Sequence, residues 1–350
     1  MGNIFELRMN NLVQIIANYR KDELPFLIDV SHVKKWISQF DSSAQSVVLE
    51  ETIHILSNWY FGHAKLVSFM REIVEYIRLA YTDFRDVTFW NGQEVGQSQR
   101  KLLSLLPEAY PGKTVNIDTV PRKHIVYIDD GLYTGSRIRK DIENVLSASS
   151  EVETLDIFFA IAYSNGFEYA KNILKQKGDE FGVAISLHRF KELNNIKQTE
   201  YADGSESYYS DIGVLWPSSR VSNEKPVKQY LKYMEDCGRT MRLKYKTEGH
   251  QYSQSIFTSC NNREIVEREF LIKGLSILPE CSIDKGLYPL GYDINPSFGF
   301  GSFCANDFNI SNTCPVVLWW DADSNWYPLL PRRINSKADF QGITAWEENS

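Results

Sequence analysis

The stretch that decides the fold runs from His124 to Leu146 and reads HIVYIDDGLYTGSRIRKDIENVL. Its first part, Ile125–Ile128, is short and apolar, which predicts a buried strand. From Ser136 to Leu146, apolar side chains recur at helical spacing, at positions 138, 142, 145 and 146. A buried strand that leads into an amphipathic helix is typical of βαβ units, so this stretch predicts an α/β fold with a mostly parallel sheet.

The surrounding sequence repeats this alternation of short apolar runs and amphipathic segments. Further strands are expected at 87–90, 114–117, 155–163 and 183–187. Helices are expected at 97–106, 166–175, 226–237 and 263–275. Residues 191–215 are polar and rich in tyrosine, which predicts an exposed excursion, and residues 287–333 are rich in Gly, Pro, Asn and aromatic residues, which predicts strands and ordered loops.

These segments predict three parts. Residues 1–85 are expected to form a helical, winged-helix-like module, because several short helices follow one another there. Its charges are mixed in sign, which favours a scaffold or protein-contact role over DNA binding. Residues 86–334 are expected to form the α/β core with an aromatic-rich C-terminal cap of strands and loops, and residues 335–350 a flexible tail.

Composition and charge exclude several classes of protein. The chain of 350 residues carries a net charge of −7, which excludes a uniformly basic surface. It has no apolar run near the roughly 20 residues of a membrane-spanning helix, and its N-terminus lacks the layout of a secretory signal. Its five cysteines show no metal-binding or redox spacing, which indicates buried, reduced thiols. We therefore expect a cytoplasmic protein without membrane contact.

The chemistry is concentrated where the predicted strand ends. Asp129 and Asp130 follow it directly, and Thr134–Arg137 opens the helix. In a parallel sheet, ligands bind beyond the carboxyl ends of the strands. The turn offers backbone N–H groups, hydroxyls and a helix N-terminus, all of which suit a phosphate, while Gly135 allows close approach and Arg137 adds a charged donor. A phosphate site beside two carboxylates that can accept from a diol predicts a sugar-phosphate ligand.

On these residues the chain resembles the phosphoribosyltransferase fold, whose signature is four apolar residues, two acids, a short variable stretch and a Thr-Gly-x-Ser/Thr turn. The resemblance implies that Asp129 and Asp130 meet the ribose 2′- and 3′-hydroxyls. It also implies that Tyr133, Thr134, Gly135, Ser136 and Arg137 hold the 5′-phosphate. The match departs from the signature at Gly131, where an aliphatic residue is usual, at Tyr133, where a small one is usual, and at Arg137, where a hydroxyl residue is usual.

A transferase of this kind also needs a loop for pyrophosphate. The segment Gly92–Gln99 follows the predicted strand at 87–90 and opens the next helix, so Gly96 and Ser98 are candidate ligand contacts. An ordinary strand–helix turn explains the same residues equally well. If the ligand is phosphoribosyl diphosphate, Mg²⁺ is expected to accompany it.

A narrower resemblance covers roughly residues 30–335. A Trp36–Phe40 segment precedes the core, and Gly299–Ser302, Asn312–Pro315 and Trp326–Arg332 follow it in order. This layout is similar to the phosphoribosyltransferase-like proteins of bacterial conflict systems. It implies a role in anti-phage defence and partners from the same operon, such as a reverse transcriptase. A catalytically inactive subunit that binds a protein or nucleic acid is the alternative.

One segment is basic although the chain as a whole is acidic. Residues 219–246 hold eight Lys or Arg residues against three acids, with tyrosines between them. Basic groups interleaved with aromatic ones suit single-stranded nucleic acid, although a solvated amphipathic helix has the same composition. The candidate nucleic-acid contacts are Lys228, Lys232, Arg239 and Arg242.

Overall fold

The computed structural model describes residues 2–92, 98–148, 151–200, 206–208, 212–241, 245–246, 256–278, 286–321 and 326–332. The chain forms two compact units. One consists of Phe61–Ile196, and the other combines Met1–Tyr60 with Lys197–Ser350. The boundary between the units falls at residue 60, whereas the sequence pattern predicts a division after residue 85. The predicted tail at 335–350 lies outside the described residues.

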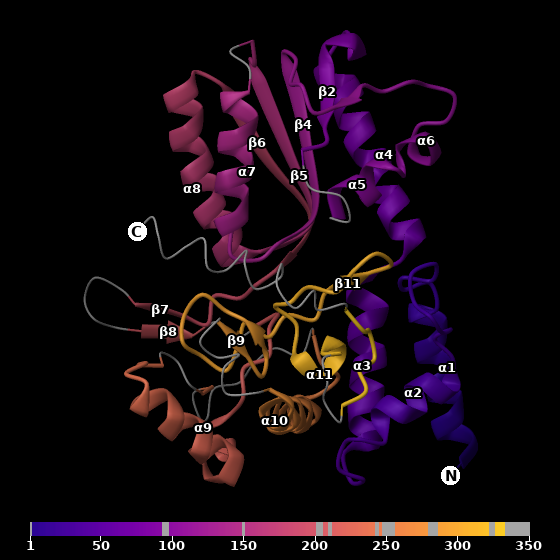
Figure 1. Ribbon diagram of the computed structural model, residues 1–350, viewed down its shortest axis with the longest axis vertical. Helices are drawn as coiled ribbons and strands as arrows, with labels where there is room; N and C mark the ends of the chain where they lie inside the picture. The colour runs from indigo at the N-terminus through magenta and orange to yellow at the C-terminus, as the bar shows by residue number, and fades with distance from the viewer. Residues whose placement is uncertain are drawn as a thin grey trace. The chain divides into compact units, whose positions relative to one another are not determined.

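The central feature of the first unit is a parallel sheet of five strands in the order β3-β2-β4-β5-β6 (Figure 1). Every neighbouring pair in it is parallel. The strands are β2 (Val87–Trp90), β3 (Ile117–Asp118), β4 (His124–Leu132), β5 (Thr154–Tyr163) and β6 (Ala184–Leu193). The predicted parallel α/β core is therefore confirmed.

Helices cover both faces of this sheet (Figure 1). On one face lie α7 (Ser136–Ser147) and α8 (Ser164–Phe181), whose apolar side chains form one buried cluster with β4 and β5. The buried residues of α7 are the four predicted from its spacing, at positions 138, 142, 145 and 146. The other face is covered by α4 (His63–Ala80), where Tyr76 packs on Phe158 of β5. The helices α5 (Ser98–Leu103) and α6 (Leu106–Ala109) and the short η1 (Phe84–Asp86) complete this unit.

Two strands extend further than the apolar runs that predict them. β4 continues through Asp129 and Asp130 to Leu132, because β5 pairs with it as far as Ala162. β6 continues to Leu193, paired with Tyr163 of β5. The strand expected at 183–187 therefore continues through His188 and Arg189, because five paired positions of β5 hold it beyond Leu187. Pairing along a long neighbour thus carries polar residues into regular strand.

A buried carboxylate fixes the contact between α4 and the sheet. Asp156 lies inside β5 and is only 3% exposed. The hydroxyl of Tyr81 donates to its Oδ2 over 2.5 Å, and the hydroxyl of Tyr76 approaches its Oδ1 at 3.4 Å. Nε2 of His188 lies 3.7 Å from the same Oδ1. A buried acid needs such partners, so this cluster ties the end of α4 to β5.

We expect Tyr81→Phe to lower the free energy of unfolding by about 1.5–3 kcal/mol, the range for hydrogen bonds to charged groups. The phenyl ring keeps the packing, but Asp156 loses its shortest hydroxyl donor. Chemical denaturation measures the change. Tyr169→Phe is the matched control, because Tyr169 is 44% exposed in the same unit. Equal stability of the two variants would show that the Tyr81 hydroxyl contributes nothing.

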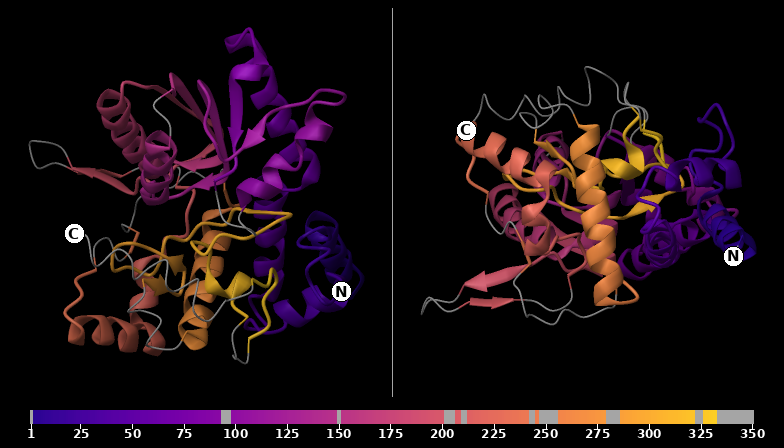
Figure 2. Two further views of the ribbon diagram at one scale, coloured as in Figure 1. Left: turned by 45° about the horizontal axis from the view of Figure 1, so that its top comes forward. Right: turned by 90° about the horizontal axis from the view of Figure 1, so that it is seen from below.

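The second unit joins the two ends of the chain. Its N-terminal helices are α1 (Gly2–Ile16), α2 (Val30–Ile37) and α3 (Gln45–Trp59). The indole N–H of Trp36 donates to the Val317 carbonyl over 3.0 Å, and Phe40 packs edge-on against Trp326. Figure 2 shows the C-terminal segment, drawn in yellow, beside α10 (Cys260–Ile277), the long orange helix. The aromatic-rich C-terminal region therefore packs with the N-terminal helices.

The remaining elements of this unit are short. They are β1 (Tyr60–Phe61), which begins in it, β7 (Gln198–Glu200), β8 (Glu206–Tyr208), η2 (Ser219–Asn223), α9 (Lys225–Asp236), β9 (Leu287–Tyr288), β10 (Gly291–Tyr292), β11 (Ala305–Asn306) and α11 (Val316–Trp319). Within the described residues after 287, the strands β9, β10 and β11 agree with the predicted mixture of strands and loops, whereas the short helix α11 was not predicted. Whether residues 1–85 include a winged-helix-like module stays a prediction.

The segment 191–215 was expected to be exposed, but its C-terminal end is buried. Residues 212–216 are almost inaccessible, because Arg263 of α10 donates to the carbonyls of Ile212 and Val214. Arg263 and Lys246 both pair with Glu267, whose side chain is 1% exposed. The expectation of an exposed excursion is therefore wrong for this part, since buried ionic contacts anchor it.

The predicted burial of the cysteines holds for only some of them. Cys304 and Cys314 are buried, as predicted, but Cys237 and Cys260 are exposed, so burial does not describe the thiols as a group. All four are free. Within the described ranges, no helix combines the length and the apolar character that a membrane crossing requires.

Candidate functional site

The candidate site lies where the order of the sheet reverses. From β2 the chain passes through α5 to β3 on one side, and from β4 it passes through α7 to β5 on the other. The adjacent carboxyl ends of β2 and β4 are therefore a topological switch point, the place where ligands bind in open α/β sheets. Both loops that the sequence singles out, after Trp90 and after Leu132, leave the sheet at this point.

Asp129 is held by several donors of the protein itself. It is 6% exposed. Its Oδ1 accepts from the Ser98 hydroxyl over 2.6 Å and from the backbone N–H of Asp130 over 2.9 Å. The Tyr127 hydroxyl approaches its Oδ2 at 3.4 Å. These contacts fix the orientation of one carboxylate, whereas the side chain of the neighbouring Asp130 is half-buried.

The contact between Ser98 and Asp129 joins the two predicted loops. Ser98 is the first residue of α5, so the helix that follows β2 begins against the acid pair of β4. Gly92 is required because a Cβ there would lie 1.8 Å from Cζ2 of Trp90, whose ring folds back over the chain and stacks on Tyr127. Residues 93–97, including the candidate contact Gly96, lie outside the described residues. The structure thus places Ser98 beside the acids, and the prediction for Gly96 stays a prediction.

The predicted phosphate turn precedes α7. Gly135 has φ 78°, which glycine adopts without strain. Thr134 Oγ1 lies 3.2 Å from the Ser136 hydroxyl and 3.4 Å from its backbone N–H. The first turn of α7 carries no acidic residue, although acids are favoured there by the helix dipole. The turn therefore combines N–H groups and two hydroxyls in an arrangement suited to an anion.

A second glycine, which sequence reasoning missed, lets α8 approach this turn. A Cβ on Gly166 would lie 2.0 Å from the carbonyl oxygen of Tyr133, and a Cβ on Gly135 would lie 2.8 Å from the carbonyl oxygen of Gly166. Only glycine fits at either position. The two glycines allow the first turn of α8 to pack directly against the candidate phosphate turn. This packing holds the backbone of the candidate phosphate turn in place.

Arg137 supplies the positive charge of the site. Partial burial works against its charge, but the carboxylates of Asp129 and Asp141 outweigh this effect and raise the pKa of its guanidinium. Its Nε lies 3.6 Å from Oδ2 of Asp141, one turn further along α7. The side chain is still 55% exposed. Arg137 is thus oriented by carboxylates and remains accessible to an anionic ligand.

Gly131 and Tyr133, two of the residues that depart from the signature, pack against each other. The ring of Tyr133 lies over Gly131, where an added Cβ would come within 2.6 Å of its Cε2. The same ring stacks on Tyr163, at the carboxyl end of β5, with centroids 5.5 Å apart and an interplanar angle of 28°. An aliphatic residue at position 131 would displace this ring. Gly131 and Tyr133 therefore form one structural feature.

Tyr127 and Asp141 are site residues that sequence reasoning missed. Tyr127 fills an apolar position of the strand and is 1% exposed, yet its hydroxyl donates to Oδ2 of Asp141 over 2.7 Å. Burial, followed by the charges of Asp129 and Asp141, raises its pKa well above the ordinary value, so the hydroxyl keeps its proton. Tyr127 thus links Asp129, at the acid pair, to the Asp141–Arg137 pair on α7. The apolar pattern of the strand hid this hydroxyl.

We expect Tyr127→Phe to lower the free energy of unfolding by about 1.5–3 kcal/mol, because the Asp141 carboxylate loses a buried hydroxyl donor. Chemical denaturation of Tyr127→Phe, Asp141→Asn and the double variant forms a double-mutant cycle. Because the hydroxyl acts through Asp141, the double variant should be less destabilised than the sum of the single effects. Strict additivity would contradict the link between the two side chains.

The candidate nucleic-acid contacts lie in the other compact unit. Lys228 and Lys232 are exposed on α9. Arg239 follows the end of this helix and hydrogen-bonds Tyr288, so it does not continue the row of lysines. Arg242 lies outside the described residues.

A parallel α/β sheet with an acid pair and the candidate phosphate turn at its switch point is compatible with a phosphoribosyltransferase-like core. The chain matches the family model PRTase-CE over residues 33–332, and it belongs to this family. No curated protein matches the chain. Among solved structures, it is similar to the AQ2163 protein from Aquifex aeolicus, with 14% sequence identity and a TM-score of 0.26 over 47% of this chain and 88% of that one.

Proposed function

We propose that the site at the switch point binds a ribose 5-phosphate group, as free sugar phosphate or as phosphoribosyl diphosphate. The observation that carries the proposal is the 2.6 Å hydrogen bond between Ser98 and Asp129, because it joins the loop after β2 to the acid pair of β4. A ribose phosphate lying across this junction would offer its hydroxyls to Asp129 and Asp130 and its phosphate to residues 134–137. The family of the chain supports the same ligand class.

Mg²⁺ is part of this proposal when the ligand is a diphosphate. Among the described residues around Arg137, the carboxylates of Asp129, Asp130 and Asp141 outnumber this one guanidinium, so a divalent cation would offset the excess negative charge beside a diphosphate. Among the described residues, no three His, Cys, Asp or Glu side chains are grouped as a metal site. This arrangement fits Mg²⁺, which usually binds through one or two carboxylates together with water and substrate phosphates. The ion would be held mainly by the phosphates of the ligand, and the Asp130 carboxylate, which accepts from the ribose hydroxyls, would contact it from the protein side.

Catalysis would follow from the same arrangement. In a phosphoribosyl transfer, the bond from the ribosyl carbon to pyrophosphate breaks, and positive charge develops on the sugar as the leaving group takes the electron pair. The carboxylates of Asp129 and Asp130 would stabilise this charge electrostatically. A lone pair on a nitrogen or oxygen of the acceptor would then form the new bond to the ribosyl carbon, and the proton of that atom would pass to solvent or to the departing pyrophosphate.

Titration calorimetry tests the proposed ligand. Wild-type protein should bind ribose 5-phosphate, and it should bind phosphoribosyl diphosphate more tightly with Mg²⁺ than without it. Unphosphorylated ribose and inorganic phosphate each offer half of the contacts and should bind more weakly. If neither ribose phosphate binds in the presence or absence of Mg²⁺, the proposal fails.

A catalytically inactive subunit that keeps the fold is the second candidate. The Tyr133–Gly131 feature favours it, because a tyrosine replaces a small residue inside the loop that would hold the phosphate. Release of pyrophosphate from phosphoribosyl diphosphate distinguishes the two candidates. Release above the uncatalysed rate with a base or nucleic acid as acceptor would exclude the inactive subunit.

We also propose that the protein acts in anti-phage defence in the cell. It is supported by the sequence resemblance over residues 30–335, which also predicts operon partners such as a reverse transcriptase. Phage plating on cells that express the chain with its neighbouring genes tests it. Protection that is lost with Asp130→Asn would support a defence role for this site, whereas equal plating with and without the genes would contradict it.

A further inference from the structure

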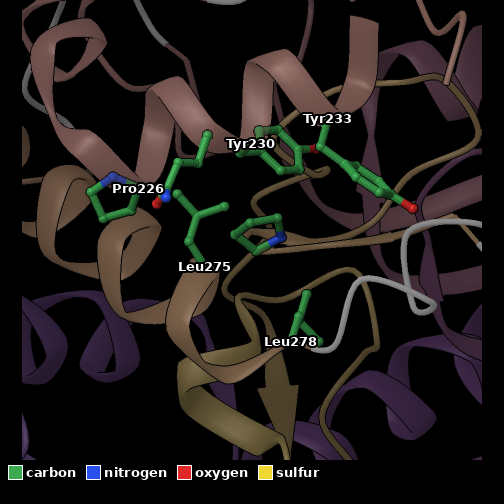
Figure 3. A pocket seen from close by; sticks show the side chains of 7 residues that line it. Pro226, Tyr230, Tyr233, Leu275 and Leu278 are labelled. Atoms are coloured by element: carbon green, nitrogen blue, oxygen red, sulfur yellow. The ribbon is translucent and has the colours of Figure 1, made fainter. Parts of the chain in front are cut away.

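A groove lies between α9 and the end of α10, within the unit formed by residues 1–60 and 197–350 (Figure 3). Its volume is about 270 Å³, and all but one of its lining residues are apolar or aromatic. This volume is just below the roughly 300–1,000 Å³ of pockets that enclose a whole drug-sized ligand. The groove therefore has room for one ring system of a larger ligand. Its lining includes Pro226, Gln229, Tyr230, Tyr233, Leu275 and Pro289.

The aromatic wall of the groove is held in place. The hydroxyl of Tyr230 donates to the Ser297 carbonyl over 2.5 Å, and its ring packs against Phe298 at 5.7 Å between centroids. Tyr233 lies one turn further along α9 and is half-buried. Figure 3 shows both rings along the same edge of the groove. A flat ligand would meet the fixed ring of Tyr230 and would not have to order it, which lowers the entropic cost of binding.

A row of lysines borders this groove. Lys225, Lys228 and Lys232 are exposed at positions i, i+3 and i+7 of α9, so they share one side of the helix. They span about 10 Å along its axis. Each lies one position before a lining residue, at 226, 229 and 233, so the row lies about 100° around the helix from these residues and its long side chains can reach the edge of the groove. Among the residues the structure describes, none of the three has an ion-pair partner.

We propose that this groove and its lysine row bind single-stranded nucleic acid. One base enters the groove and stacks on Tyr233, and the phosphates of the same strand lie along the lysines. A base is planar and stacks on aromatic rings whatever its sequence, which matches a wall of tyrosine and proline. The unpaired positive charge outside matches the backbone. This site is separate from the ribose-phosphate site and does not depend on it.

The lining favours a base over an acidic peptide. Gln229 is the one side chain of the lining with an amide, and Tyr230 already uses its hydroxyl internally. A peptide lying in the groove would lose water from its backbone N–H and C=O groups without gaining partners, which is costly. A base can keep its polar edge toward solvent while its faces are buried.

Fluorescence anisotropy with a labelled oligothymidylate of about 16 nucleotides tests the proposal on the full chain. Wild-type affinity should fall with salt. Tyr233→Ala should weaken binding by between about fivefold and 150-fold, the usual loss for one stacked base, without changing the salt slope. Tyr233→Phe keeps the ring and should bind like wild type. Lys228→Ala/Lys232→Ala should reduce the salt slope by about 1.4, since each phosphate contact on a single strand adds about 0.7.

The control for charge is Lys21→Ala/Lys34→Ala, which removes two exposed lysines of the same unit away from α9 and should leave the slope unchanged. Thermal unfolding verifies that each variant is folded. The proposal is overturned if the oligonucleotide does not bind, or if it binds the groove variants and the control variants equally. It is also overturned if polyglutamate competes as well as the oligonucleotide, because the occupant would then be an acidic peptide.

Discussion

Asp130→Asn should weaken binding of ribose 5-phosphate by about 10- to 150-fold. The fold-change corresponds to about 1.5–3 kcal/mol, the range for hydrogen bonds to a charged group. Asp130 is half-buried, and we assign its carboxylate to the ribose hydroxyls. Asparagine keeps the size of the side chain but removes its charge and replaces one acceptor oxygen by a donor.

Asp129→Asn is the informative comparison, because the two acids have different surroundings. The Ser98 hydroxyl and the backbone N–H of Asp130 both donate to Asp129, and the Tyr127 hydroxyl lies 3.4 Å from its other oxygen. An amide nitrogen at this position would face donors, so this variant should lose both affinity and stability. Calorimetry with ribose 5-phosphate and chemical denaturation measure the two quantities. Undiminished affinity in Asp130→Asn would remove this residue from the site.

Arg137→Ala should weaken binding of ribose 5-phosphate by about 10- to 150-fold, because the phosphate loses a charge-assisted donor. The same variant should not weaken binding of unphosphorylated ribose. Asp129 and Asp141 already hold the guanidinium beside the turn, so little ordering is needed when the phosphate arrives. Calorimetry at low ionic strength measures the affinities, since salt screens an exposed charge.

Arg139→Ala is the matched control. Arg139 lies in the same helical turn and is 56% exposed, close to the 55% of Arg137, but it pairs with Glu143. Its removal should change ribose 5-phosphate affinity far less. If the two variants lose affinity equally, only the general positive charge of α7 matters, and Arg137 has no specific role.

The core of the fold follows from local sequence patterns. The four buried positions of α7 and the apolar runs of β4 and β5 are each visible within about ten residues, because burial on a helix or strand imposes a short period. The acid pair and the turn at Gly135 are visible for the same reason. Each belongs to one continuous stretch in which strand end, loop and helix start follow one another.

The rest depends on partners far apart in the chain. The hydroxyl of Tyr127 is functional only because Asp141 lies opposite it, and the strand pattern counts tyrosine as apolar. Gly166 is required by the carbonyl of Tyr133, which belongs to a different βα loop. The pairing of Trp36 with Val317 joins segments 281 residues apart, and no periodicity reports such a contact. The roles of these residues are therefore set by tertiary packing and are not visible in the local sequence pattern.

A crystal structure of the protein with ribose 5-phosphate tests the central claim most directly. The account predicts the phosphate at the N-terminus of α7, within hydrogen-bond distance of the backbone N–H groups of residues 134–137 and of Arg137. It also predicts the 2′- and 3′-hydroxyls at the carboxylates of Asp129 and Asp130. A ligand bound away from the carboxyl ends of β2 and β4, or with its phosphate at the acid pair, would contradict the account.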